Sequence, residues 1–296
     1  METEIKQFMD YLSQERQASK NTQISYRRDL GQMELYLREQ GITEAQKVTK
    51  TVLNSYVLYL ERQGRASTTI SRVLASIKAF FHYEFRQGNI RRDPAELLKA
   101  PKVEKKAPTI LTVEEVTSLL NQPSGGSPKE VRDKAMLELL YATGIRVSEL
   151  VGLKMGDINL SVGFITCRDQ HKERTVPFGR AAKAALAQYL EEARFSLLKG
   201  NQSEQLFVNC SGSPMSRQGF WKIIKHYGEK AKIKEDITPH TLRHSFAAHL
   251  IGRGADIQAV QTMMGHSDMA TTQAYTAYVE KEDSVMAAYH TAHPRP

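Results

Sequence analysis

The first hundred residues carry apolar side chains at the spacing of an amphipathic helix, four times in succession. An α-helix has 3.6 residues per turn, so the positions i, i+3, i+4 and i+7 lie on one face. The pattern begins with Ile5, Phe8, Met9 and Leu12. It recurs in three further stretches, 24–37, 53–60 and 70–81. No alternation typical of a strand occurs before residue 100, so we predict a small bundle of four helices.

A short polar segment separates this part from the rest of the chain. The segment PKVEKKAP, residues 101–108, has proline at both ends and charged residues between them, a composition typical of an extended connector. A chain of 296 residues is long enough for two domains at roughly 100–200 residues each. We therefore predict an N-terminal helical domain over 1–100, a linker over 101–108 and a second domain over 109–296.

The second domain also shows clear helix starts. Thr112 with Glu115 forms a capping box, and Ser127, Pro128 and Glu130 supply the N-cap, first and third positions of another helix. That helix runs through an apolar stretch and ends at a glycine. Further helices are predicted near 180–195, near 216–231 and after the Thr-Pro pair at 238–239.

Between these helices the pattern changes to that of strands. GFITC (163–167) and RTVPF (174–178) are short β-prone runs that flank the polar stretch RDQHKE, which is typical of a hairpin. The apolar run 206–208 is predicted as a third strand. The fold class predicted for the whole chain is mainly α with a small antiparallel β-sheet.

Charge and composition narrow the possible partners. Lys and Arg number 41 against 33 Asp and Glu, which gives a net charge of +8, divided equally between the first hundred residues and the remainder. This balance favours a polyanion such as nucleic acid. No run of 18 apolar residues and no export signal is present, so we expect neither a membrane span nor secretion but a cytoplasmic protein. With two cysteines and no C-x-x-C, we expect neither a disulfide framework nor zinc.

The segment TPHTLRHSFAAHL gathers three basic side chains near a helix start. His240, Arg243 and His244 are spaced i, i+3 and i+4, so they share one face in the first turn of the helix. Backbone N–H groups and guanidinium donors at a helix N-terminus favour an anion. The H-x-x-x-H spacing also occurs in zinc sites, but Thr241 follows the first histidine where a zinc protease has its glutamate. We therefore predict an anion site rather than a metal site.

Two other segments add residues of the same chemical type. YATGIRVSEL places Arg146 at the start of a helix, and GHSDMATTQAY places His266 just after a helix and Tyr275 on the next one. Two arginines, several histidines and a tyrosine suit phosphoryl transfer without a metal or other cofactor, because guanidinium groups can neutralise the phosphate oxygens. A tyrosine hydroxyl, with a pKa of about 10, can attack phosphorus when a base takes its proton.

The chain resembles the tyrosine recombinases of the phage integrase family, and among them the bacterial Xer chromosome-dimer resolvases. The resemblance covers nearly the whole chain. It includes ASKNTQISYRRDL and ASTTISRVLASIKAFFHYEF in the first domain, and ATGIRVSELVGLKMGDI, HTLRHSFAAHL and GHSDMATTQAYTAYV in the second. The nine-residue step from His266 to Tyr275 also matches.

The resemblance implies a role for each matching residue. Arg146 and Arg243 match the two arginines that hold the phosphate, and His240 matches the histidine that accepts or shares the tyrosine proton. His266 matches a second, hydrogen-bonding histidine. Tyr275 matches the nucleophile that becomes joined to the 3′-phosphate of DNA.

The family also uses a lysine in the β-hairpin loop to protonate the leaving 5′-oxygen. Many members have GKGNKER there, whereas this chain has CRDQHKER, so the first lysine is absent. Lys172 is the remaining lysine in the loop, and Arg168 lies near it in sequence. We assign the role to Lys172, because a guanidinium with a pKa above about 12 is a poor proton donor.

The resemblance further implies that the catalytic domain and the N-terminal core-binding domain together surround duplex DNA. It implies a homo- or hetero-tetramer on two duplexes, with an exchange helix after Tyr275 docking into a neighbouring subunit. A paralogous recombinase and a septal DNA translocase are possible further partners. The alternatives are an integrase of a mobile element with the same chemistry, and a catalytically inactive DNA-binding protein, which the presence of both arginines and the tyrosine disfavours.

Overall fold

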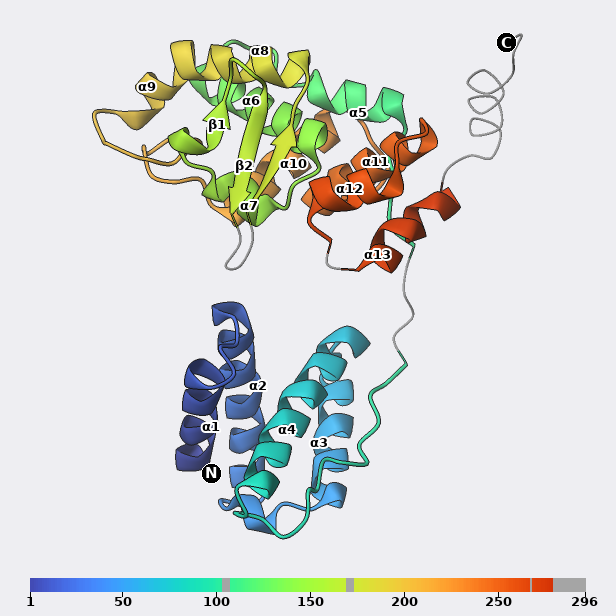
Figure 1. Ribbon diagram of the computed structural model, residues 1–296. Coiled ribbons are helices and arrows are strands. Elements are labelled where there is room, and N and C mark those ends of the chain that lie inside the picture. Colours follow the sequence, from blue (N-terminus) through green and yellow to red (C-terminus); the bar gives the residue numbers. More distant parts are fainter. Residues whose placement is uncertain (103–106, 169–172, 267, 279–296) are drawn as a thin grey trace. The chain divides into compact units, whose positions relative to one another are not determined.

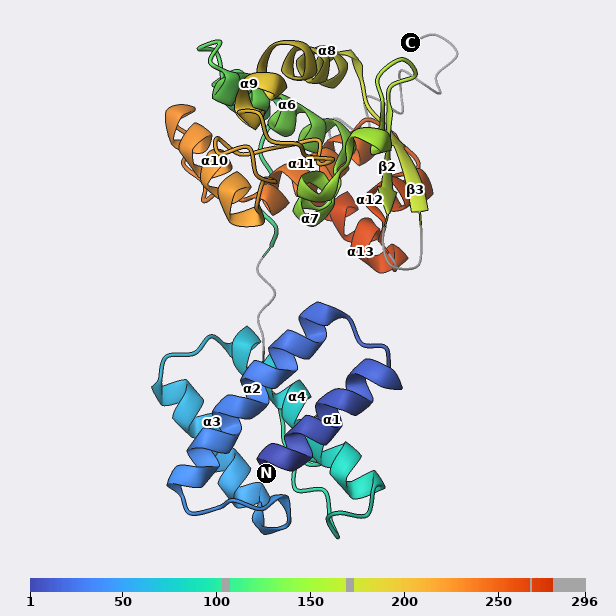
Figure 2. The same ribbon diagram turned by 90° about the vertical axis from the view of Figure 1, so that its left-hand side faces the viewer.

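The computed structural model describes residues 1–102, 107–168, 173–266 and 268–278. The chain divides into two compact units, Met1–Lys106 and Ala107–Pro296. Each unit has its own hydrophobic core, and each is described by itself below (Figures 1 and 2). Among the helices that the structure describes, none is both long enough and apolar enough to cross a membrane.

The first unit is a bundle of four α-helices, as predicted. Ser19 and Thr49 cap two of these helices by accepting a hydrogen bond from the backbone N–H three residues later. The elements are α1 (Glu2–Gln14), α2 (Lys20–Glu39), η1 (Ala45–Lys47), α3 (Lys50–Arg62) and α4 (Ser67–Arg86).

The predicted apolar stripes form the core of this bundle. Phe8 of α1 packs edge-on against Phe80 of α4, with 5.7 Å between the ring centroids. α2 packs against both α1 and α4. Figure 2 shows the four helices of the unit around this shared interior. Burial of one face of each helix is what stabilises helices of this length.

The second unit combines nine α-helices with a small sheet in its described residues. Its α-helices are α5 (Val113–Leu120), α6 (Pro128–Thr143), α7 (Val147–Gly152), α8 (Arg180–Gln188), α9 (Arg194–Leu198), α10 (Arg217–Lys230), α11 (Pro239–Gly252), α12 (Ile257–Met264) and α13 (Met269–Gln273). Its other helical segments are the 3₁₀ turns η2 (Met155–Asp157) and η4 (Ala274–Tyr278) and the π-helical η3 (Tyr189–Ala193). The predicted caps at Thr112 and Ser127 are present.

The sheet is antiparallel, in the order β1–β2–β3. Its strands are β1 (Ile158–Asn159), β2 (Phe164–Arg168) and β3 (Glu173–Pro177), and β2 and β3 form the predicted hairpin with Cys167 opposite Arg174.

The predicted third strand at 206–208 is wrong. These three residues are fully buried, but Val208 forms only an isolated bridge with Pro214. Leu206 N donates to Leu153 O at 2.7 Å, and Phe207 O accepts from Met215 N at 3.0 Å. An apolar run shows that a segment is buried and does not show where its backbone hydrogen bonds go.

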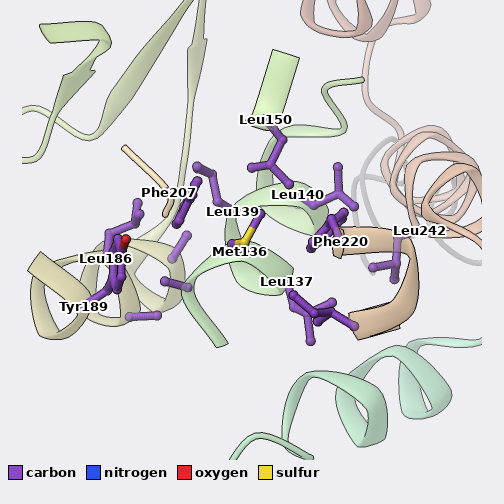
Figure 3. Packing of buried hydrophobic residues seen from close by; sticks show 14 of the residues in the cluster. Met136, Leu137, Leu139, Leu140, Leu150, Leu186, Tyr189, Phe207, Phe220 and Leu242 are labelled. Atoms are coloured by element: carbon purple, nitrogen blue, oxygen red, sulfur yellow. The ribbon is translucent and has the colours of Figure 1, made fainter. Parts of the chain in front are cut away.

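Helix α6 lies at the centre of the second core. Its side chains are buried on most sides, and it packs against α5, α7, α8, α11 and the sheet. Figure 3 shows side chains from α6 surrounded by those of α7, α8, η3, α10 and α11. The labelled residues are Met136, Leu137, Leu139, Leu140, Leu150, Leu186, Tyr189, Phe207, Phe220 and Leu242.

Gly144 ends α6 with a left-handed conformation (φ 59°). A Cβ there would lie 2.2 Å from the Phe246 ring, so only glycine allows α6 and α11 to approach this closely.

Candidate active site

The N-terminus of α11 is the centre of the candidate site. Thr238 caps it by accepting from Thr241 N, and proline stands at its first position. His240, Arg243 and His244 therefore fall on the first turn and a half of a helix, as predicted. α11 packs against α6, α12 and η4, which bring the other segments of the site to it (Figure 1).

Arg243 is buried, with 5% of its surface exposed, and is held by main-chain carbonyls. Its Nη1 donates to Gly144 O, and its Nη2 donates to Met264 O at 2.7 Å. Burial, together with the charge of Arg146, lowers the pKa of Arg243 to about 10. The guanidinium remains charged at neutral pH and has no carboxylate among these partners.

Arg146 lies just before α7, with its guanidinium half-buried. Nη2 donates to Gly265 O at 2.5 Å, and Nη1 pairs with Glu149 at 3.3 Å. Glu149 also accepts from the Arg146 backbone N–H at 2.7 Å and from Arg174 on β3 at 2.7 and 2.9 Å. Although burial alone would raise it, these hydrogen bonds hold the pKa of Glu149 below its ordinary value.

The turn between α12 and α13 completes the arginine site. Gly265 ends α12 at φ 64°, and its carbonyl and that of Met264 face the two arginines. His266 follows directly, and its Nδ1 lies 2.9 Å from Thr272 Oγ1. Burial, together with the charges of Arg243 and Arg146, lowers the pKa of His266 to about 4, so its ring is neutral at pH 7.

Tyr275 lies in η4 with 4% of its surface exposed. Its Oη is 2.6 Å from His244 Nδ1, and its ring is stacked at 6.4 Å from the ring of His266. Burial raises the pKa of Tyr275, and the nearby charge of Arg243 opposes this effect. The tyrosine is therefore protonated in the resting protein.

Four of the six predicted site residues thus meet at one place: Arg146, Arg243, His266 and Tyr275. His240 lies beside them but is exposed, with its ring 6.2 Å from that of His244. Lys172 lies outside the residues that the structure describes. Arg168, the other residue considered for its role, pairs with Asp157 and Glu173.

Sequence reasoning gave no role to three further residues of the site: Glu149, Arg174 and His244. Glu149 follows Arg146 by three residues at a helix start, so a capping contact could have been predicted from spacing. The spacing predicts the helix face on which His244 lies, but no pattern in the sequence indicates its pairing with Tyr275. Within the described part of the chain, no group of three or more His, Cys, Asp or Glu is placed to hold a metal ion.

Two domain families match the chain. Residues 109–282 match the Phage integrase family, and residues 5–88 match its N-terminal SAM-like domain. The chain is 45% identical to tyrosine recombinase XerD of Halalkalibacterium halodurans, over 98% of this chain and 97% of that protein. It is 43% identical to tyrosine recombinase XerD of Staphylococcus aureus, over the full length of both.

Solved structures share the fold. XerH site-specific recombinase bound to a palindromic difH substrate aligns with a TM-score of 0.74 at 20% identity, over 97% of this chain and 85% of that one. A lambda integrase fragment bound to a core site aligns with a TM-score of 0.73 at 16% identity, over 93% of this chain and 94% of that one. The chain belongs to the phage integrase family, as a tyrosine recombinase of the Xer type.

Proposed function

We propose that this recombinase cuts and rejoins duplex DNA at a specific site, with Tyr275 as the nucleophile. Tyr275 Oη attacks the phosphorus and forms a 3′-phosphotyrosyl bond, the bond from phosphorus to the 5′-oxygen breaks, and the 5′-oxygen leaves as a hydroxyl. The observation that carries the proposal is that Tyr275, His266 and the two arginines come together from three separate segments.

The two arginines bind the phosphate that is attacked. Both guanidiniums donate to neighbouring carbonyls at the C-terminal end of α12, which fixes their positions. Preorganised donors of this kind stabilise charge that develops in the transition state without reorganising during the reaction. His266, neutral at pH 7, donates a further hydrogen bond to the phosphate, and His240 shares the proton of Tyr275.

Lys172 protonates the leaving 5′-oxygen. Arg168 is engaged by two carboxylates, and this supports the lysine as the proton donor. A proton from Lys172 and the loss of a proton from Tyr275 balance the cleavage step, and the reverse transfers accompany rejoining.

The biological role that fits is resolution of chromosome dimers at cell division, in the cytoplasm. Identity of 43–45% over nearly the full length of proteins named XerD supports this role over that of a mobile-element integrase. The protein acts as a tetramer on two duplexes, with itself or with a paralogous recombinase, and a septal DNA translocase activates it. The exchange helix expected after Tyr275 falls beyond residue 278, outside the residues that the structure describes.

A nicked suicide duplex tests the reaction. The duplex is taken from the replication-terminus region of the source chromosome, and denaturing gels detect protein joined to DNA. We expect an adduct with the wild-type protein and none with Tyr275→Phe, which should still fold and bind DNA. Peptide mapping of the adduct that found DNA on another tyrosine would contradict the assignment. Cleavage only at the ends of a mobile element would favour the integrase function.

A further inference from the structure

Helix α11 makes two histidine–tyrosine hydrogen bonds of the same type, five residues apart. His244 Nδ1 lies 2.6 Å from Tyr275 Oη, and His249 Nδ1 lies 2.8 Å from Tyr141 Oη. The His249 pair ties α11 to α6, and its Nε2 bonds to Leu111 O, so its function is structural. The His244 pair instead ends on the hydroxyl that attacks phosphorus in the proposed function.

The surroundings of His244 favour the neutral form of its ring. The charged and titratable groups that face it are His240 and Arg243 on its own helix, His266 after α12, and Tyr275 in η4. Burial, followed by the effects of His240 and Arg243, lowers the pKa of His244. A neutral ring has one nitrogen with a free lone pair. In the tautomer that carries the ring proton on Nε2, Tyr275 Oη donates and His244 Nδ1 accepts.

This contact links the nucleophile to the arginine beside it. Arg243 is the preceding residue on α11, and its guanidinium is fixed to Gly144 O and Met264 O. Tyr275 itself lies in a short 3₁₀ turn, which has weaker internal hydrogen bonds than an α-helix. The helix that fixes the phosphate-binding arginine therefore also fixes the hydroxyl, through the next side chain.

We propose that His244 is a positioning residue, which holds the Tyr275 hydroxyl at a fixed position relative to Arg243 before the phosphate is attacked. The inference rests on the proposed function of Tyr275 as the nucleophile. It assigns His244 a task separate from that of His240, which is exposed and shares the proton during the reaction.

The first test compares three variants in single-turnover adduct formation with saturating DNA. His244→Leu should slow the step roughly 10²-fold, the order expected when a reacting group is misplaced by about 1 Å. His244→Asn, whose amide oxygen can replace Nδ1 as the acceptor, should recover most of that loss. His249→Asn is the matched control, because it changes an equivalent pair on the same helix, and it should leave the rate within about threefold of wild type.

A second test removes the tyrosine hydroxyl from the reaction. A duplex carrying a 3′-p-nitrophenyl phosphate opposite a free 5′-hydroxyl can be ligated without Tyr275: the 5′-oxygen bonds to phosphorus and p-nitrophenol leaves. In the Tyr275→Phe background, adding His244→Leu should leave this ligation within twofold, because His244 acts through the missing hydroxyl. Adding Arg243→Ala should abolish it.

These outcomes separate the two proposals. Loss of ligation with His244→Leu in the Tyr275→Phe background, or a wild-type adduct rate for His244→Leu, would overturn the positioning role. An adduct that persists in Tyr275→Phe would overturn the proposed nucleophile instead. The hydrogen bond itself is checked without DNA by ¹⁵N NMR, in which the His244 Nδ1 signal should shift in Tyr275→Phe and an unchanged signal would overturn the inference.

Discussion

Arg174 donates from both terminal nitrogens to the carboxylate of Glu149, at 2.7 and 2.9 Å. Glu149 in turn accepts from the backbone N–H and the guanidinium of Arg146. A strand of the hairpin is thereby tied to the helix start that carries Arg146, one of the two arginines proposed to bind the phosphate. The position of Arg146 depends on this carboxylate.

Glu149→Gln should slow cleavage more than it weakens DNA binding. The amide keeps the shape but loses the charge that pairs with both arginines, and hydrogen bonds to charged groups contribute about 1.5–3 kcal/mol. We expect a rate roughly 10- to 100-fold lower, from single-turnover adduct formation. Equal losses of rate and affinity would mean that the carboxylate supports only binding.

The sequence predicted the helices better than the contacts between them. The capping box at Thr112 and the glycine stop at 144 are local signals, and both appear in the structure as predicted. The run 206–208 carried only a burial signal, and it forms an isolated bridge rather than a strand of the sheet. In the site, Glu149 and Arg174 are 25 residues apart on different elements, so no local pattern relates them. The arginines, His266 and Tyr275 were assigned through the family resemblance.

The stability of the protein should fall in mild acid, in part because of His266. Its pKa is lowered to about 4 in the folded state, against 6.5 for a free histidine. Between these values the unfolded chain binds a proton at this ring and the folded protein does not, so stability is lost as the pH drops from 6.5 to 4. Thermal unfolding of His266→Gln should show a smaller loss between pH 7 and pH 5 than the wild type. An identical loss in both proteins would contradict the assignment.

Arg243→Ala should abolish most of the rate while leaving much of the DNA affinity. Loss of one preorganised donor costs roughly 3–4 kcal/mol of transition-state stabilisation. Many other Lys and Arg residues remain to contact phosphates and to give the salt dependence of binding. Gel-shift and cleavage assays are compared on one duplex, and equal losses would make Arg243 a binding residue only. We also expect the cleavage rate of the wild-type protein to be unchanged by EDTA, which removes divalent metal ions. In the proposed function the two arginines, rather than a metal ion, neutralise the charge on the phosphate.

Gly265→Ala should displace Arg174 in addition to lowering the stability of the protein through backbone strain. The residue has φ 64°, and a Cβ would lie 2.8 Å from Arg174 Cζ. Gly254→Ala is the matched control, because Gly254 has φ 83° and nothing within 4 Å of its Cβ position. Both variants should lose about 1–2 kcal/mol of stability from the left-handed conformation. Only Gly265→Ala should also slow cleavage strongly, and equal rates in the two variants would show that the turn tolerates displacement of Arg174.

The last prediction concerns the proton donor to the leaving group. If Lys172 protonates the 5′-oxygen, Lys172→Ala should slow cleavage of ordinary DNA by roughly 10²- to 10⁴-fold, the usual range for a general acid. A substrate with sulfur at the 5′-bridging position needs little proton donation, because a thiolate leaves readily. On that substrate Lys172→Ala should regain most of its rate, and Arg146→Ala should not.

Arg168→Ala is the comparison that decides between the two candidates. Arg168 pairs with Asp157 and Glu173, so its guanidinium is already engaged by two carboxylates, and a guanidinium is in general a poor proton donor. We therefore expect Arg168→Ala to have the same modest effect on both substrates. A sulfur rescue of Arg168→Ala without one of Lys172→Ala would assign the acid role to Arg168. Equal, modest defects of Lys172→Ala on both substrates would instead mean that the lysine only contacts the DNA backbone.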